Sequence, residues 1–312
     1  MNSNLDKDNS AVLLLGYGGP NALDEVPEFL KDIRGGRPTS PAFVDEITDR
    51  YRQIGGASPL YPITQRLALS LQERLGKPVY VGMRHWRPFI QDTLSRMESD
   101  GISHFNTLCL APHYSYLSVG AYEKALQHGL SKFENPPSYQ LLASWHRHPL
   151  FIRAWANNIQ SILSSLDLHT TRILCTAHSL PARIIEENDP YVFQLTETME
   201  LIQKELNLSS EHFQLAYQSA ALTGEPWLSP SVESLLPKLA REGIQQVVIA
   251  PIGFVAEHVE VLYDIDIAFQ KIAKENQISL FRTSLLNDSP AMVELLVSLM
   301  SECNESTSTS RS

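Results

Sequence analysis

A histidine stands directly after an apolar segment in the second half of the chain. His178 follows the run Ile173–Thr176 and precedes Ser179-Leu180-Pro181. A short apolar run ended by chain breakers is typical of a buried parallel strand. A histidine at such a strand end points out of the sheet, where it can accept a proton or bind a metal. A hydrogen-bonded loop histidine is an equally good reading of its position alone.

Three acidic residues lie close together farther along the chain. If the chain is helical from Val255 onward, Glu257, Glu260 and Asp264 fall at i, i+3 and i+7, on one face. Acids in a first helical turn also favour the helix dipole, which explains Glu257 better than Asp264. Carboxylate and imidazole together suit Fe(II), but also Zn(II) and other metals. The residues therefore predict a metal-handling enzyme without identifying the metal.

Several other catalytic signatures do not occur. The sequence contains no Walker loop, no Gly-x-Gly-x-x-Gly fingerprint, no His-Glu-x-x-His motif and no Gly-x-Ser-x-Gly elbow. The glycine-rich segment 16–19 ends in Pro20, which lacks the N–H that a phosphate-binding loop would use. These observations argue against nucleotide-driven, zinc-hydrolytic and serine-hydrolytic chemistry.

Charge and composition narrow the partners and the compartment. The formal net charge is −10 and no Lys/Arg-rich block occurs, so a nucleic-acid partner is not expected. No apolar run approaches the roughly 20 residues of a membrane span, and the polar N-terminus is unlike a signal peptide. We therefore expect a soluble, cytoplasmic protein. Three cysteines are too few for a disulfide framework, and Cys109 and Cys175, whose roles the sequence does not give, are expected as buried thiols.

Strand-like and helix-like segments alternate from end to end. The expected strands are 11–15, 79–82, 106–110, 139–143, 172–176, 213–217, 246–250 and 280–282. Amphipathic segments between them include 64–75, 151–166, 191–206, 231–241 and 290–300. This alternation predicts an α/β protein with parallel sheets and crossover helices.

A short internal repeat indicates two similar halves. The segment Leu13–Pro20 matches Leu174–Pro181 in pattern, which makes Tyr17 and His178 equivalent strand ends. Ligands of open α/β sheets bind beyond the carboxyl ends of the strands. We predict one domain over residues 1–147 and a second over 148–304, with the last helix packing back on the first half. Residues 305–312 are expected to form a disordered tail.

The chain resembles the ferrochelatase family over almost its whole length. The matching pieces appear in order: 16–20, 33–37, 50–60, 111–115, 177–181, 217–219, 226–228 and 253–264. The combination of His-Ser-Leu-Pro at 178–181 with Glu-His-x-Glu-x-Leu-Tyr at 257–263 is specific, whereas each piece alone would be weak.

This resemblance implies a fold, a reaction and a set of residues. The fold would be two Rossmann-like domains of class II chelatase type, with a porphyrin cleft between them. The reaction would insert Fe²⁺ into a porphyrin during heme biosynthesis, with His178 and Glu260 as the catalytic, iron-handling pair and Asp264 as a further metal residue. Six residues match porphyrin-lining positions: Tyr17, Arg34, Arg50, Tyr51, Ser58 and Tyr122.

The resemblance also bears on cofactors and partners. No cofactor is expected beyond the substrate iron. An iron–sulfur cluster is not expected because Cys303 stands alone near the C-terminus. The expected partners are the porphyrin and ferrous iron, with transient contact to neighbouring heme-pathway enzymes.

Two features favour the coproporphyrin III branch, whose product is coproheme. A tyrosine, Tyr17, stands in the first glycine loop, and the stretch between Arg34 and Arg50 is short. A protoporphyrin IX enzyme giving protoheme is the main alternative. A cobalt or nickel chelatase is less favoured because of the block 51–56, and a non-catalytic heme-binding protein because both His178 and Glu260 are present.

Overall fold

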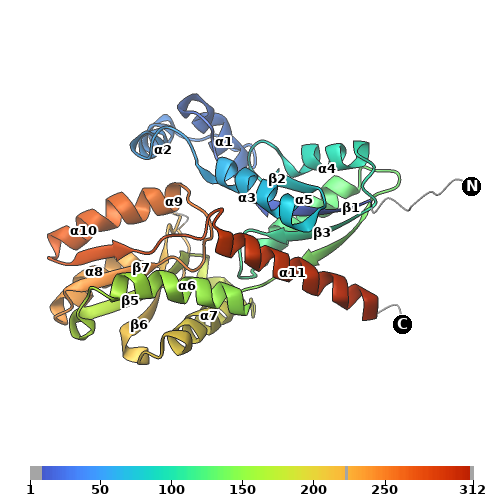
Figure 1. The fold of residues 1–312 in the computed structure, drawn as a ribbon. Helices are drawn as coiled ribbons and strands as arrows, with labels where there is room; N and C mark the ends of the chain where they lie inside the picture. The colour runs from blue at the N-terminus through green and yellow to red at the C-terminus, as the bar shows by residue number, and fades with distance from the viewer. Residues whose placement is uncertain (1–8, 222–223, 310–312) are drawn as a thin grey trace, which may run out of the picture.

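The computed structural model describes residues 9–221 and 224–309, which form two parallel sheets of four strands each (Figure 1). The first sheet has the order β2-β1-β3-β4 and the second β6-β5-β7-β8. The strands are β1 (Ser10–Gly16), β2 (Val79–Met83), β3 (His104–Cys109), β4 (Ser138–Leu142), β5 (Thr171–His178), β6 (Phe213–Gln218), β7 (Gln246–Ala250) and β8 (Ser279–Arg282). The eight strands expected from the sequence are therefore confirmed.

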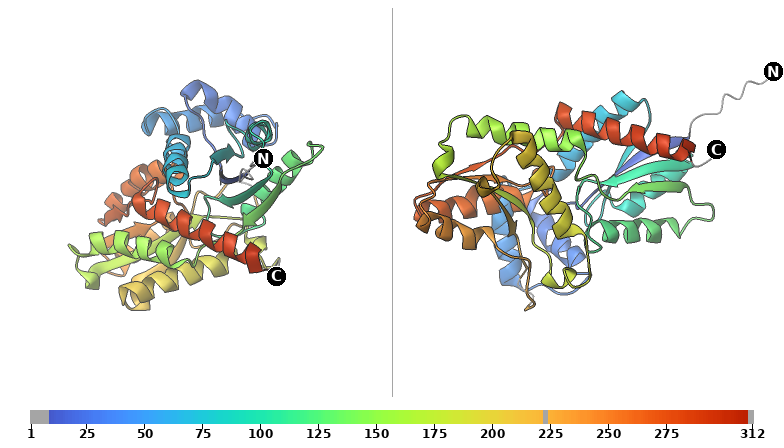
Figure 2. Two further views of the ribbon diagram at one scale, coloured as in Figure 1. Left: turned by 45° about the vertical axis from the view of Figure 1, so that its right-hand side comes forward. Right: turned by 90° about the horizontal axis from the view of Figure 1, so that it is seen from below.

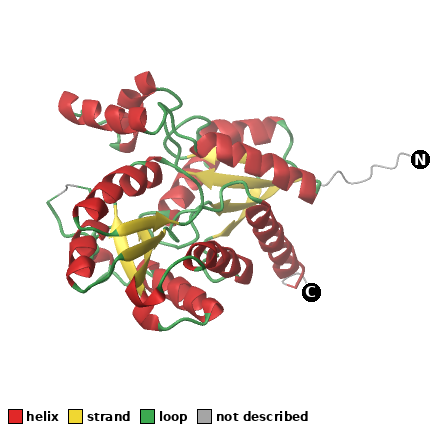
Figure 3. Cartoon of the chain, turned by 60° about the vertical axis from the view of Figure 1, so that its left-hand side comes forward, coloured by secondary structure: helices red, strands yellow, loops and turns green. Residues whose placement is uncertain are grey.

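Helices cover both sheets (Figure 3), which explains why the central strands are apolar on both faces. The α-helices are α1 (Val26–Ile33), α2 (Pro41–Gln53), α3 (Leu60–Leu75), α4 (Ile90–Ser99), α5 (Val119–Leu130), α6 (Pro149–Leu163), α7 (Tyr191–Leu206), α8 (Val232–Arg241), α9 (Val259–Leu262), α10 (Gln270–Glu275) and α11 (Pro290–Thr309). None of the helices described is long and apolar enough to cross a membrane.

The two sheets repeat one topology, which confirms the internal repeat. In the first sheet β1 lies between β2 and β3, and in the second sheet β5 lies in the same way between β6 and β7. Tyr17 directly follows β1, and His178 is the last residue of the equivalent strand β5. Both residues therefore lie at the carboxyl edges of their sheets, the edges at which α/β proteins bind ligands.

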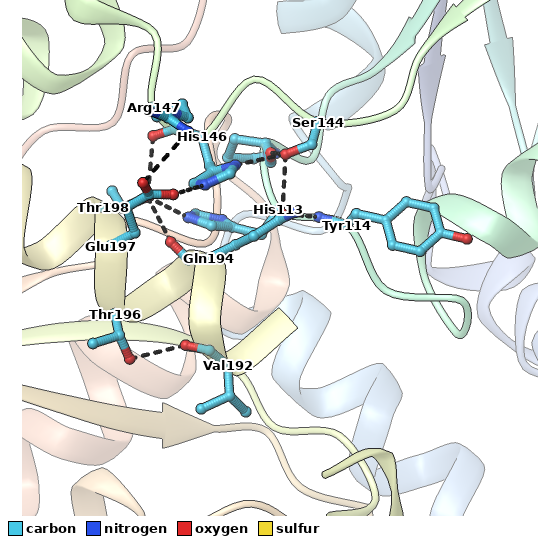
Figure 4. A network of polar contacts seen from close by, with 11 residues as sticks. His113, Tyr114, Ser144, His146, Arg147, Val192, Gln194, Thr196, Glu197 and Thr198 are labelled. Carbon is cyan, nitrogen blue, oxygen red and sulfur yellow. Dashed lines mark hydrogen bonds and ion pairs between the residues drawn. The ribbon is translucent and has the colours of Figure 1, made fainter. Parts of the chain in front are cut away.

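The linker between the sheets is held on α7 by a buried polar network (Figure 4). His113, just after β3, contacts the Thr198 hydroxyl through Nε2 at 2.9 Å, and His146 of the linker contacts Glu197 at 2.7 Å. Gln194 accepts a hydrogen bond from the backbone N–H of Tyr114 at 2.7 Å. The network joins both halves at the place where the chain crosses between them. The division at residues 147 and 148 stays a prediction.

The last helix, α11, starts in the second half and lies along α3 of the first (Figures 1 and 2). Two ion pairs accompany this packing, Arg66 with Asp288 at 2.6 Å and Arg74 with Glu294 at 2.8 Å. α11 continues to Thr309, and the expected disordered tail at residues 305–312 stays a prediction. A helix anchored by a buried apolar face can extend through residues of weak helix propensity. Residues 310–312 lie outside the described part of the chain.

The fully buried strand β1 supplies a test of the core. Leu14 is 0 % exposed at the centre of β1, whereas Leu69 on α3 is 56 % exposed. Leu14→Ala should lower the free energy of unfolding by about 2–5 kcal/mol, because it leaves a cavity that parallel strands cannot close. The matched change Leu69→Ala should stay within about 0.5 kcal/mol. Urea unfolding followed by circular dichroism measures both, and equal effects would contradict this placement of β1.

Candidate active site

His178 is fixed at the end of β5 by contacts to its backbone and its ring. Its carbonyl accepts a hydrogen bond from the hydroxyl of Tyr191 at 3.0 Å. Its Nδ1 donates to the carbonyl of Ser179, which turns Nε2 toward Glu260. The neighbouring strand adds support, because the Ser179 N–H donates to the carbonyl of Gln218 at 2.8 Å. The imidazole is therefore held in one orientation before any substrate arrives.

Glu260 lies between two histidines. One carboxylate oxygen is 3.5 Å from Nε2 of His178, and the other is 3.4 Å from Nε2 of His258. His258 in turn bonds through Nδ1 to the carbonyl of Ala256 at 2.9 Å. The side-chain amide of Gln218 donates to the backbone carbonyl of Glu260 at 2.7 Å, which ties the start of α9 to the end of β6.

The pair His178 and Glu260 is ionised at neutral pH. Burial alone would lower the pKa of His178, but the charge and hydrogen bond of Glu260 outweigh it and raise that pKa to about 9. Burial would likewise raise the pKa of Glu260, but His178 and then His258 hold it well below its usual range. Each side chain still exposes about a third of its surface, 32 % and 33 %, so both face open space.

Asp264 is the first residue of a π-helix, Asp264–Phe269, which follows the short helix α9 that carries Glu260. Burial raises its pKa to about 6, and the charge of Glu260 adds to this, while Ser219 and Arg50 oppose it. The hydroxyl of Ser219 donates a hydrogen bond to the carboxylate of Asp264, and Arg50 Nη1 lies 3.8 Å from that carboxylate. A carboxyl group with this pKa can take up and release protons near neutral pH.

Arg50 reaches the second half from α2, which lies above α9 in Figure 1. Besides Asp264 it contacts Glu46 at 2.7 Å, and its guanidinium lies 5.0 Å from the ring centre of Tyr263. Arg50 thus already has two carboxylate partners, and a substrate carboxylate would have to compete with them.

The expected helix from Val255 onward is wrong, and Glu257 does not share a face with Glu260. His258 is in extended backbone, and α9 begins only at Val259. Glu257 instead accepts a hydrogen bond from Arg282 at 3.1 Å, and Arg282 also binds Asp266. The partner of Glu257 lies on β8. Of the three acids expected on one helix face, only Glu260 and Asp264 therefore remain.

Three tyrosines of the first half lie within electrostatic reach of Glu260. Burial, followed by the charge of Glu260, raises the pKa of Tyr17 to about 12. Burial and then the charge of Glu260 raise the pKa of Tyr51. Burial also raises the pKa of Tyr122, with smaller effects from Cys109, Tyr17 and Glu260. The charge of Glu260 thus acts on Tyr17, the residue that follows the strand equivalent to that of His178.

The remaining expected porphyrin residues are Ser58 and Arg34. Ser58 is buried, and its hydroxyl lies against Gly19, where a β-carbon would approach it to 2.6 Å. Its hydroxyl oxygen accepts from the N–H of Leu60 at 3.3 Å. Arg34 is exposed at the C-cap of α1, and no contact of its side chain links it to His178 or Glu260 among the residues described.

Sequence reasoning missed two residues on the wall that carries Tyr17. The backbone N–H groups of Arg84 and His85 donate to the carbonyls of Gly16 and Tyr17, both at 2.9 Å. The ring of His85 lies 4.7 Å from that of Tyr17, and its Nδ1 contacts Asp32 at 2.8 Å. Burial lowers the pKa of His85 despite this contact. Their place directly after the expected strand 79–82 was the available signal.

The cysteines are buried thiols, as expected for Cys109 and Cys175. All three are buried, and none forms a disulfide within the described part of the chain. Burial raises the pKa of Cys109, and that of Cys175 to about 12, so neither ionises readily.

Sequence comparisons match this chain over nearly its full length. The sequence model of the ferrochelatase family matches residues 9–303. A protein of Deinococcus radiodurans named ferrochelatase is 41 % identical over 93 % of this chain and 94 % of its own. A protein of Geobacillus kaustophilus named coproporphyrin III ferrochelatase is 34 % identical over 94 % and 96 %.

Solved structures of chelatases share the fold at low sequence identity. SirB from Bacillus subtilis, solved with Fe³⁺, aligns with a TM-score of 0.59 at 11 % identity over 94 % of each chain. CbiX, described as the terminal enzyme for biosynthesis of siroheme in denitrifying bacteria, aligns with a TM-score of 0.54 at 12 % identity, covering 94 % and 98 %. These similarities confirm the expected two-sheet, class II chelatase-like fold.

The ion pair predicts how the His178 ring titrates. In the native protein its pKa should be about 9. Glu260→Gln removes the charge that outweighs burial, so the pKa should fall by at least about two units. Asp264→Asn, the matched acid-to-amide change, should lower it less because Asp264 has the smallest of the effects that raise it. NMR of the imidazole nitrogens as a function of pH measures all three.

A native pKa near 6.5 would contradict the ion pair. The raised pKa also fixes a sign for stability, because the folded ring keeps its proton where the unfolded ring loses it. The contribution of His178 to stability should be complete below pH 6.5 and lost as the pH rises through about 9.

Proposed function

The chain belongs to the ferrochelatase family and is an enzyme that inserts a metal into a porphyrin, and we propose that it inserts Fe²⁺ into coproporphyrin III to give coproheme. The observation that carries the site is the ion pair of His178, at the end of β5, with Glu260, whose charge also acts on Tyr17 after the equivalent strand β1. Several relatives are named for coproporphyrin III, whereas others are named ferrochelatase without a porphyrin. The choice of porphyrin is therefore our proposal.

The porphyrin would lie between Tyr17 and the pair His178 and Glu260. Coproporphyrin III carries four propionates, and protoporphyrin IX has vinyl groups in place of two of them. A buried carboxylate without donors costs several kcal/mol, so four propionates require a polar lining. The hydroxyls of Tyr17, Tyr51 and Tyr122, the hydroxyl of Ser58 and the guanidinium groups of Arg34 and Arg50 would supply it.

Iron is a substrate that has to leave the protein for the porphyrin. His178 Nε2 and a carboxylate oxygen of Glu260 would bind it, a donor pair that suits Fe(II). Among residues 9–221 and 224–309 there is no group of three or more His, Cys, Asp and Glu side chains placed to hold a metal ion. We propose no resident cofactor and no iron–sulfur cluster.

The charge state of the pair suggests an order of proton movements. Before iron binds, the proton on His178 balances the charge of Glu260. Fe²⁺ would displace this proton, because a metal-binding imidazole nitrogen must be unprotonated. When iron moves to the porphyrin, the two pyrrole nitrogens lose their protons. The vacated His178 is a base that can accept one of them, and the other would pass by way of Asp264 to solvent.

Asp264 would carry protons between this pair and solvent. Its pKa of about 6 lies below that of His178 and nearer to neutral pH than that of an ordinary carboxyl. Ser219 and Arg50 hold it in place. The expected cytoplasmic location and transient contact with other heme-pathway enzymes stay predictions.

The proposed roles rank three substitutions. His178→Ala should reduce metal insertion to background while porphyrin binding stays within about tenfold, because the lost group acts mainly on the rate. Glu260→Gln should be nearly as severe, and Asp264→Ala milder, since Asp264 only relays protons. Anaerobic insertion assays together with porphyrin fluorescence titrations measure both quantities. A rate for His178→Ala within a few-fold of wild type, or the reverse ranking of the two acids, would contradict these roles.

The choice of porphyrin is tested by direct competition. In an anaerobic assay with Fe²⁺, kcat/KM for coproporphyrin III should exceed that for protoporphyrin IX by at least about tenfold, or 1.4 kcal/mol in transition-state binding. Detergent must be the same in both reactions, because the dicarboxylic porphyrin aggregates more readily in water. Equal turnover would overturn the coproporphyrin assignment while leaving the family membership intact.

A further inference from the structure

We propose that Arg84 binds one of the carboxylates of the porphyrin substrate. The inference deepens the proposed function and depends on it for the identity of the ligand. Arg84 comes directly after β2, and its backbone N–H donates to the carbonyl of Gly16 at 2.9 Å. Its main chain is therefore fixed beside the loop that carries Tyr17.

The side chain of Arg84 is directed along this wall. Its guanidinium carbon lies 5.7 Å from the ring centre of Tyr122, which is almost fully buried. Its positive charge acts on Tyr17, Tyr122 and His85, so it is close to all three. Stacking on an aromatic face leaves the edges of the guanidinium plane free to donate hydrogen bonds.

Arg84 differs from nearby arginines in having no acidic partner. Within the part of the chain that the structure describes, no ion pair or side-chain hydrogen bond involves its guanidinium. Arg50 has Glu46 and Asp264, and Arg87 has Glu28 at 3.4 Å. Arg84 is only partly exposed, so its charge has lost part of its hydration without a compensating anion.

A carboxylate is the anion that this geometry fits. Guanidinium and carboxylate form paired hydrogen bonds in one plane, and the Tyr122 ring lies beside the guanidinium. A porphyrin held between Tyr17 and the pair His178 and Glu260 would have its edge beside Tyr122 and Arg84. A propionate on that edge would meet the unpaired guanidinium. Arg84, rather than the engaged Arg50, is therefore the cation best prepared for a substrate carboxylate.

Arg87 provides a matched control in the same loop. It also stacks on an aromatic ring, with its guanidinium carbon 5.3 Å from the ring centre of Trp86, but it is exposed and paired. Arg84→Met and Arg87→Met remove the same atoms and the same charge. Urea unfolding of both variants establishes that they are folded under the conditions of the binding assay.

The experiment is equilibrium binding of metal-free coproporphyrin III to the full-length chain, followed by porphyrin fluorescence. Arg84→Met should weaken binding at least tenfold and Arg87→Met less than twofold. Arg84→Lys should recover part of the loss, because it restores the charge without the planar fork. The binding of wild type should also fall more steeply with salt concentration than that of Arg84→Met.

Mesoporphyrin IX, which has two propionates, separates this proposal from the choice of porphyrin. If Arg84→Met weakens the binding of both porphyrins at least tenfold, Arg84 binds a propionate that the two porphyrins share. The proposal then stands even if the wild-type protein shows no preference for coproporphyrin III. A loss confined to coproporphyrin III places Arg84 at a propionate that only it carries. Equal effects of Arg84→Met and Arg87→Met on coproporphyrin III would overturn the proposal, as would unchanged binding in Arg84→Met. If Arg84→Met does not fold, Arg84→Lys with wild-type affinity and wild-type salt dependence would overturn it too.

Discussion

The carboxylate of Glu260 requires a positively charged partner, and several contacts of the second half serve to place that partner. A charge held away from bulk water needs a partner of opposite sign close by, and His178 is that partner. For the two to meet, β5 must end at His178 and α9 must begin just before Glu260. Gln218 and Tyr191 fix the backbone on each side of this contact. The resulting pair carries a proton that a divalent cation can replace, so one interaction provides both a stable resting state and a place for incoming iron.

The first half meets the complementary requirement, which is to present hydroxyl and guanidinium groups to a ring with acidic substituents. The two sheets repeat one topology, so Tyr17 and His178 stand at equivalent strand ends, and the charge of Glu260 acts on Tyr17. The arm of α1 and α2 then extends over α9, where Arg50 meets Asp264. This contact connects Arg50, which would bind the porphyrin, with Asp264, which would carry protons. The two residues come from opposite halves of the chain.

Much of this arrangement could be predicted from the sequence, because it follows from local patterns. Buried parallel strands give continuous apolar runs, so the end of β5 and the position of His178 were readable. The start of α9 was not, because Glu257 is drawn to Arg282, a residue 25 positions later on another strand. Arg84 was overlooked for a similar reason: its significance lies in forming no ion pair with the residues that the structure describes, which is a property of the folded chain. Pairings of charges between distant segments are not encoded in any local spacing.

The packing of α11 has a consequence for how the chain matures. Leu67 and Leu71 on α3 belong to the same buried cluster as Leu295 and Leu296 on α11. During synthesis this face of α3 is made long before α11, the helix that covers it. Until α11 has been made and has docked, the first half keeps this apolar surface exposed. Chains that stop before α11 would carry the exposed leucines by which protein quality control recognises unfinished products.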